Sequence, residues 1–354
     1  MSAVTARASN LVPPVAVGIA LLDLAGLSWW ALSTVVLAAT VLAAVHHAEV
    51  VAARVGEPFG TLILALAVTV IETGLIVSLM LAAPEGASTL ARDTVFAASM
   101  IILNLMLGIC LIAAARRLVE QRFVRTGANA AISTIAALLV LTLVLPNFTT
   151  SVPGPIYSPA QLAFVAAFAL ILYLTFVFAQ TIRHRDYFVR PAVPGDDVDH
   201  RPSAGVAGLS FTLLLFSLVA VVLLAKGLST PLEETIAAAG APRALVGIVI
   251  AGVVLLPEGL AALKAARLGL LQTSLNLALG SALATIGLTI PAVTVVAFLL
   301  DLPLALGLDT KGMVLLTLTL FISSLSLARG RVTVLHGAVH LVIFAAYLLV
   351  TIVP

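Results

Sequence analysis

Two glutamates inside long apolar segments are the residues of this chain best placed to do chemistry. Glu72 lies in TLILALAVTVIETGLIVSLML, and Glu258 lies in ALVGIVIAGVVLLPEGLAAL. An ionisable side chain within a membrane span is costly and usually marks a pathway for ions or protons. Because each half of the chain supplies one carboxylate, we expect the two to form one shared cation site.

Burial limits what two such carboxylates can do. In a site of low dielectric they cannot both stay ionised and empty, because each loses its hydration and repels the other. The favourable states are protonated, or ionised around a cation. Cation and protons then exclude one another, as antiport requires. A structural carboxylate pair is the alternative, but no Lys or Arg occurs at matching depth in these segments.

Oxygen ligands are available near both glutamates. Pro257 removes a backbone donor and is expected to disrupt the helix near Val253, which leaves a carbonyl free for an ion. Carboxylates and carbonyls suit a hard cation such as Ca²⁺, and Na⁺ fits the same ligands. Further candidate ligands are Thr69, Ser99, Asn104, Asn276, Ser281 and Thr285. Each hydroxyl could instead form a hydrogen bond to the backbone of its own helix. Gly280 is expected to allow a close helix approach that brings Ser281 and Thr285 towards the site.

Composition sets the class of protein. Of 354 residues, 62% are hydrophobic and 10% charged, and the mean hydropathy is +1.21. A soluble domain carries about 25% charged residues, so we expect an all-α polytopic membrane protein. The sequence shows no basic aromatic patch for nucleic acid, no motif for a cofactor and no HExxH or GxSxG signature of an intramembrane enzyme. The single cysteine, Cys110, excludes an intrachain disulfide.

Apolar runs of about 20 residues predict eleven spans. They cover roughly 12–29, 31–53, 59–83, 93–115, 128–146, 160–182, 207–226, 242–263, 271–299, 311–328 and 332–353. With the N-terminus in the cytoplasm and the C-terminus outside, the inside loops hold 14 of the 18 Lys and Arg residues. This asymmetry agrees with the positive-inside rule and supports both the orientation and the span count.

The spans divide into two groups of five after the first. We expect an N-terminal tail and first helix (1–30), a first five-helix repeat (31–183), a cytoplasmic linker (184–206) and a second repeat (207–354). A unit of five spans inverts when it is repeated, and transporters of this kind bind their ions near the midplane. Glu72 and Glu258 each fall in the second span of a repeat. The strings LNLMLG (103–108) and LNLALG (275–280) are a weaker internal echo.

Other ionisable residues are candidates for proton relay or pH sensing. They are His46, His47, Glu49, Glu57 and His340. Histidine titrates near neutrality, but the first four also fit a polar cap at the membrane interface, and His340 also fits a buried histidine bonded to a hydroxyl. Glu233 and Glu234 either guide cations or belong to a surface helix. For Asp23 we expect a hydrogen bond to a neighbouring span.

Three stretches carry a resemblance to a known family. HHAEVVAARVGEPFGTLILALAVTVIETGLIVSLM (46–80), LLPEGLAALKAARLGLLQTSLNLALGSALATIGLTIPAVT (255–294) and GRVTVLHGAVHLVIFAAYL (330–348) resemble the ChaA-type calcium/proton antiporters of the cation/Ca²⁺ exchanger superfamily. The resemblance covers essentially all spans. It implies the inverted five-plus-five fold with an extra first helix, and it implies that Glu72 and Glu258 carry the cation and the protons. Members of this family exchange Ca²⁺ for H⁺, and some also move Na⁺ or K⁺.

The sequence departs from that family in two places. The central loop holds only Asp196, Asp197 and Asp199 instead of a long acidic run, so a solvated linker is favoured there. The glutamates stand in VIETG and LPEGL, unlike the GNATE-like strings of many exchangers. We therefore expect a Ca²⁺/H⁺ antiporter of the bacterial inner membrane, with the lipid bilayer and small cations as its partners. The alternatives are a Na⁺(K⁺)/H⁺ antiporter of the same fold and a cation channel.

Overall fold

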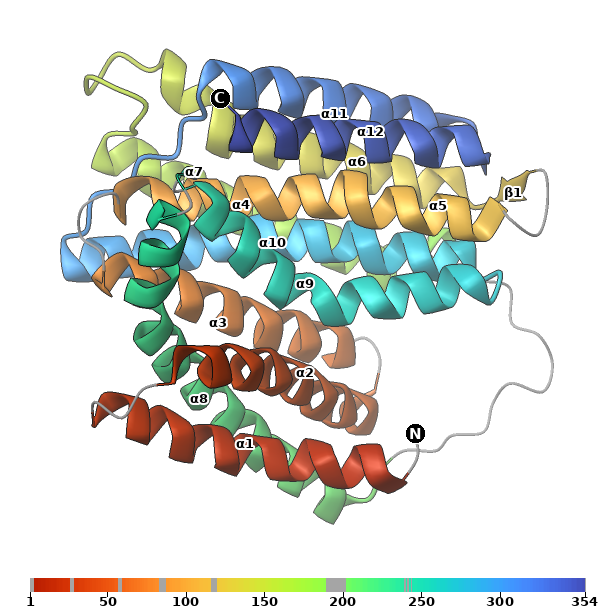
Figure 1. Cartoon of the computed structure of the whole chain (residues 1–354). Helices are drawn as coiled ribbons and strands as arrows, with labels where there is room; N and C mark the ends of the chain where they lie inside the picture. Colours follow the sequence, from red (N-terminus) through yellow and green to blue (C-terminus); the bar gives the residue numbers. More distant parts are fainter. Residues whose placement is uncertain are drawn as a thin grey trace. The chain divides into compact units, whose positions relative to one another are not determined.

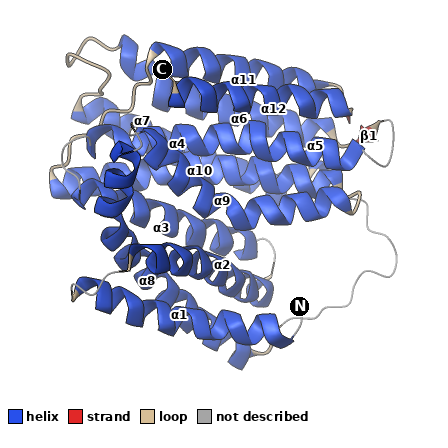
Figure 2. Ribbon diagram, viewed as in Figure 1, coloured by secondary structure: helices blue, strands red, loops and turns tan. Residues whose placement is uncertain are grey.

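Helices make up almost the whole molecule (Figure 2). The computed structural model describes residues 3–25, 29–56, 59–82, 87–115, 120–188, 202–238, 240, 242 and 244–353. Helices predominate because lipid offers no hydrogen-bond partners, so a spanning segment must pair its backbone N–H and C=O groups internally.

The helices follow the predicted spans closely. The α-helices are α1 (Ala3–Leu24), α2 (Trp30–Val55), α3 (Phe59–Ala82), α4 (Ala87–Met100), α5 (Leu107–Ala115), α6 (Arg125–Leu139), α7 (Pro159–Phe178), α8 (Ala204–Ala238), α9 (Ala244–Arg267), α10 (Leu271–Leu300), α11 (Thr310–Ala328) and α12 (Val334–Ile352). Three π-helical turns continue α4, α6 and α7, namely η1 (Ile101–Met106), η2 (Val140–Val144) and η4 (Ala179–Arg183). The 3₁₀ turns are η3 (Leu145–Phe148) and η5 (Arg185–Tyr187).

The described residues contain nine helices long and apolar enough to cross a membrane, and two shorter apolar helices, Ser9–Asp23 and Leu66–Leu81. The prediction of a polytopic helical membrane protein is therefore confirmed, while the count of eleven spans stays a prediction. The largest difference in length is at α8, which runs well past the predicted end at 226 to Ala238.

The chain forms two compact units, and each draws on both halves of the sequence. The first unit comprises residues 1–87 and 192–246, and the second comprises 88–191 and 247–354. This division reflects packing, whereas the predicted repeats reflect internal symmetry. The predicted boundaries at 30, 183 and 206 therefore stay predictions.

The first unit is a bundle of four helices. Helix α8 packs against α1, α2 and α3, and α2 also packs against α1 and α3. One small cluster in this bundle joins Ala16 and Ala20 of α1 to Ala220 and Leu224 of α8. Small residues let these two helices approach closely, which is how helices associate where lipid and side chains are equally apolar.

The second unit is built around the span that runs from α4 through η1 to α5. In its apolar 18-residue stretch 78% of the residues are buried, against 22% in the corresponding stretch of α12. Met100, Ile102 and Leu107 of this span are fully buried, whereas α12 exposes Leu335 and Leu349 to the surroundings. Helix α12 packs on α5 and on α11. Helices α11 and α12 are the two neighbouring blue helices of Figure 1. The central span is thus enclosed by protein, and α12 faces lipid on one side.

A two-stranded ribbon, which the all-helical prediction did not include, closes one end of the second unit. Strands β1 (Gln121–Arg122) and β2 (Arg331–Val332) pair antiparallel, with Gln121 opposite Val332 and Arg122 opposite Arg331. Two residues per strand are too few for a detectable alternation in sequence. The ribbon joins the loop before α6 to the turn between α11 and α12.

Candidate functional site

Glu72 lies within helix α3 of the first unit and is only 3% exposed. Thr69, one turn earlier on the same face, is 5% exposed. Thr73 follows directly, and its buried Oγ1 has no hydrogen-bond partner among the residues that the structure describes. A buried hydroxyl without a partner is costly, so Thr73 is a further candidate ligand. The sequence signal for it was a hydroxyl next to the carboxylate in VIETG.

Glu258 lies in α9 of the second unit. It is half-buried, and its Oε2 atom is shielded from solvent. Pro257 stands inside α9, which is nevertheless helical from Ala244 to Arg267. The expected disruption near Val253 therefore does not end the helix. The effect of the proline is limited to one backbone hydrogen bond. Pro257 has no N–H and cannot donate to the Val253 carbonyl.

From the helical rise we expect Ser281 of α10 at about the depth of Glu258. Helices α9 and α10 are joined by a turn at 268–270, so they run antiparallel. Glu258 stands nine residues before the end of α9, about 13 Å at the usual helical rise. The equivalent depth on α10 falls at 280–281. Thr285, one turn further, is 3% exposed.

Among the residues that the structure describes, Gly280 does not make the close helix approach that the sequence suggested. A Cβ added there meets no atom within 4 Å among the described residues, whereas at Gly287 it would lie 2.6 Å from the Cβ of Tyr173. The close approach of α10 to α7 therefore occurs two turns later. A glycine within a span allows a neighbouring helix to come close. Which glycine makes that contact depends on how the helices pack.

Asn276 is held near the beginning of α10. Its Nδ2 donates to the backbone carbonyl of Phe188, and its Oδ1 accepts a hydrogen bond of 3.0 Å from Gln272. The Oε1 of Gln272 in turn accepts from the backbone N–H of Val124 at 2.8 Å. These bonds tie α10 to the ends of neighbouring elements, which gives Asn276 a structural task away from the depth of Glu258.

Asn104 belongs to a buried polar network in the second unit. It lies in η1 and is fully buried. Its Nδ2 donates to Thr319 Oγ1 at 3.0 Å, and its Oδ1 lies 3.4 Å from His340 Nδ1. His340 Nε2 lies 3.3 Å from Ser326 Oγ. The expectation that His340 pairs with a hydroxyl is confirmed, and π-helical turns such as η1 frequently occur at functional sites.

Ser99 uses its hydroxyl within its own helix, where it donates to the Val95 carbonyl at 2.8 Å. This is the alternative that the sequence left open for every candidate hydroxyl. An ion would have to compete with that bond, so Ser99 is the weakest of the proposed ligands.

The histidine pair of α2 contacts α1. His47 is fully buried and its Nε2 lies 3.1 Å from the Ser9 carbonyl. The His46 ring is 5.4 Å from that of His47, and Glu49 is exposed. Glu57 lies outside the described residues. The contact with Ser9 gives His47 a role in holding α1 against α2. A role in proton relay or pH sensing stays a prediction for His46, His47, Glu49 and Glu57.

Two other polar positions have structural partners. Asp23 accepts a hydrogen bond of 2.7 Å from Ser33 Oγ of α2, which confirms the expected bond to a neighbouring span. Glu233 and Glu234 fall within the last turns of α8, where Glu234 is exposed.

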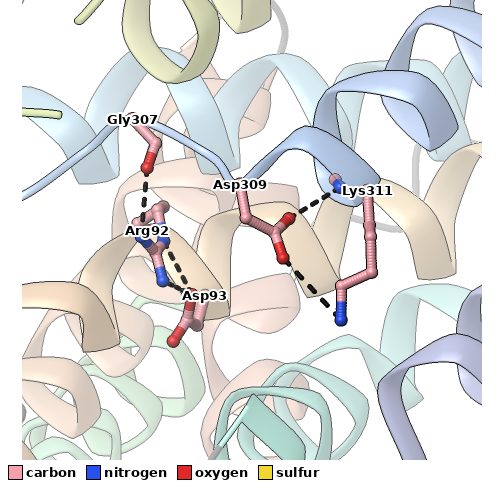
Figure 3. Close-up of polar contacts among 6 residues, drawn as sticks. Arg92, Asp93, Gly307, Asp309 and Lys311 are labelled. Atoms are coloured by element: carbon pink, nitrogen blue, oxygen red, sulfur yellow. Dashed lines mark hydrogen bonds and ion pairs between the residues drawn. The ribbon is translucent and has the colours of Figure 1, made fainter. Parts of the chain in front are cut away.

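A charged cluster that the sequence did not single out joins α4 to the segment before α11 (Figure 3). Arg92 bonds Asp93 at 2.7 Å and the Gly307 carbonyl at 3.0 Å. Asp309 caps α11 through the Gly312 N–H at 2.7 Å and lies 3.9 Å from Lys311. The arginine neutralises the nearby carboxylate, so this cluster anchors a loop and offers no cation site.

Within the described ranges, no group of three or more His, Cys, Asp and Glu side chains could hold a metal ion. The predicted cation site would have only two carboxylates and would be completed by hydroxyl and carbonyl oxygens. It therefore does not require a group of three such side chains. Such ligands suit a hard cation carried as substrate, not a resident soft metal.

The sequence matches the sodium/calcium exchanger protein family over residues 25–182 and 209–353. The chain belongs to this family. It is 47% identical over 325 residues to an inferred ionic transporter of Sinorhizobium fredii, y4hA, covering 91% of this chain and 88% of that one. It is 35% identical over 345 residues to the sodium-potassium/proton antiporter ChaA of Escherichia coli, covering 96% and 90%.

A solved structure shares the fold. The Ca²⁺/H⁺ antiporter protein YfkE, in selenium-substituted form, superposes with a TM-score of 0.71 at 13% identity, over 97% of this chain and 99% of the other. At that identity the likeness establishes the architecture. The resemblance that the sequence suggested, to exchangers of this superfamily, is confirmed.

Proposed function

We propose that the protein is a secondary antiporter that exchanges Ca²⁺ for protons across a membrane. The observation that carries this proposal is Glu72, a carboxylate that is 3% exposed within an apolar helix of a sodium/calcium exchanger family member. Glu258 supplies the second carboxylate from α9. Relatives and structural neighbours named as cation/proton antiporters support the coupling to protons.

Calcium is our choice of ion because two carboxylates and several neutral oxygens fit the six to eight ligands that Ca²⁺ takes in irregular geometry. The name of YfkE, a Ca²⁺/H⁺ antiporter, supports it. The second candidate is a Na⁺(K⁺)/H⁺ antiporter, favoured by the name of ChaA, the relative that is 35% identical. Both candidates use the same residues and the same coupling.

Coupling follows from competition for the carboxylates. When the site is protonated it carries no net negative charge and does not hold the cation. When the protons leave, the two ionised groups repel one another until a cation bridges them. If the site opens to one side at a time, entry of protons drives the cation out. The moving element would be one group of helices sliding against another.

The proposed setting is the bacterial inner membrane, with the N-terminus in the cytoplasm and the C-terminus outside. The 14-to-4 distribution of Lys and Arg supports that orientation. We further propose that the protein needs no cofactor and is not an enzyme, since its cations and protons are substrates of transport.

Ion competition in proteoliposomes tests the choice of substrate. When a pH gradient is imposed, addition of Ca²⁺ should dissipate it. Excess Na⁺ or K⁺ should not change the rate of this dissipation. If Na⁺ or K⁺ dissipates the pH gradient and excess Ca²⁺ does not affect this, the protein is a Na⁺(K⁺)/H⁺ antiporter instead. Cation flux that persists without any proton gradient and moves no protons would point instead to a channel.

A further inference from the structure

A basic pocket lies at the end of the second unit where the two-stranded ribbon closes it. Its volume is about 800 Å³, and its walls come from the start of α6, the last turns of α11, strand β2 and the first turns of α12. Arg125, Arg329 and Arg331 line it, and Glu120 is its one acidic lining residue. All three arginines belong to loops that we predict to be cytoplasmic.

The turn between α11 and β2 brings these arginines together. Gly330 adopts a left-handed conformation with φ of +66°, which disfavours any residue with a Cβ. A Cβ at this position would also lie 3.3 Å from the Cβ of Arg125 and 3.1 Å from the Phe123 carbonyl. The Phe123 N–H donates to the Gly330 carbonyl at 3.1 Å. The glycine thus lets the α6 loop lie against the turn, with Arg125 beside Arg329 and Arg331.

The positive charge of this pocket exceeds its negative charge. Arg331 pairs with Glu120 at 3.5 Å, and both side chains are about half exposed. Neither Arg125 nor Arg329 has a carboxylate partner among the described residues. Helix α12 begins directly after Thr333, which lines the pocket, so the positive end of its dipole adds to the field. An anion is the ligand that this charge distribution favours.

The pocket also has an apolar rim. Leu325 and Leu335 line it and are 54% and 71% exposed, and Ile322 and Val339 continue the lining along α11 and α12. On helices that face lipid, such a rim receives acyl chains. A free inorganic anion gains nothing from it, whereas a lipid satisfies the arginines with its headgroup and the leucines with its tails.

We propose that this pocket binds the headgroup of an acidic phospholipid, with the phosphate between Arg125 and Arg329 and the acyl chains along α11 and α12. The site is independent of the proposed cation site and of the identity of the transported ion. It would fasten the ends of three helices of the second unit to the lipid surface on the predicted cytoplasmic side.

The test compares two double variants of the full chain. Arg125→Gln with Arg329→Gln removes the two arginines that lack a partner and leaves the Arg331–Glu120 pair intact. Arg183→Gln with Arg185→Gln removes two exposed arginines of the same unit that lie outside the pocket. Detergent-solubilised protein is titrated with dioleoyl phosphatidylglycerol, and bound lipid is counted by native mass spectrometry.

We expect the first pair to weaken binding about 30-fold, since each basic residue near an anionic surface contributes about 1 kcal/mol, and the second pair to leave it unchanged. Dioleoyl phosphatidylcholine should bind weakly, and excess inorganic phosphate should not displace the acidic lipid. Arg329→Gln alone should weaken binding about five-fold and replaces the double variant if that one misfolds. Equal losses in both pairs, equal binding of phosphatidylcholine, or displacement by phosphate would each overturn the proposal.

Discussion

The Oδ1 atom of Asn104 and the Nδ1 atom of His340 lie 3.4 Å apart in the buried interior of the second unit, although 236 positions separate them in sequence. The contact is possible because α5 and α12 cross closely at two glycines. A Cβ on Gly337 would lie 2.7 Å from the Gly108 carbonyl, and one on Gly108 would lie 3.0 Å from the Gly337 carbonyl. The crossing positions a polar network inside an apolar core.

Replacing Asn104 by leucine should destabilise the protein measurably. The change leaves His340 Nδ1 and Thr319 Oγ1 buried without Asn104 as partner, which costs about 1–3 kcal/mol. Ser99→Ala is the matched control in the same span, because it removes only a hydroxyl bonded to its own helix. Reversible unfolding in mixed micelles gives both free energies of unfolding. Equal stability of Asn104→Leu and Ser99→Ala would contradict a structural role for the network.

The sequence predicted the helices well because lipid requires continuous apolar segments, and these are visible as runs of letters. It also singled out Glu72 and Glu258 as candidates, since a carboxylate in such a run is conspicuous, and their role in cation binding stays a prediction. It could not distinguish Gly280 from Gly287, because only packing shows that Tyr173 stands beside the second. Nor could it find the Arg92–Asp93 cluster, whose partner Gly307 comes from a distant loop.

The apparent affinity for the cation should rise with pH. If cation and protons compete for the same carboxylates, each proton displaced makes affinity change by up to about ten-fold per pH unit. Binding is then weakest in acid, where the carboxylates are protonated, and strengthens as they ionise. Initial rates against Ca²⁺ concentration at several pH values measure this directly. An affinity that does not change with pH would show that the two ligands do not share a site.

Ser281 and Asn276 should differ in their effect on transport. From the helical rise we expect Ser281 at about the depth of Glu258, so Ser281→Ala should raise the apparent KM for the cation about 5- to 10-fold, as expected for one lost polar contact. Asn276→Ala should leave the apparent KM unchanged and lower stability instead, because its side chain bonds Gln272 and the Phe188 carbonyl. The reverse pattern would move the site towards the beginning of α10.

Cysteine labelling should establish the orientation. The native Cys110 is buried, so a membrane-impermeant maleimide has little background. Lys311→Cys, at the exposed start of α11, should react in intact cells, and Arg185→Cys should react only after the membrane is opened. The opposite result would place the N-terminus outside, and reaction of both in intact cells would mean that the span count is wrong.

The most direct test of the account is Ca²⁺-driven proton movement in proteoliposomes for the wild type, Glu72→Gln and Glu258→Gln. Glu234→Gln is the control, since this glutamate is exposed at the end of α8. The glutamine variants keep the size of the side chain and remove its charge. The account predicts that wild type and Glu234→Gln release an imposed pH gradient on addition of Ca²⁺, while both site variants remain folded and fail. Normal exchange by either site variant would contradict the paired-carboxylate mechanism.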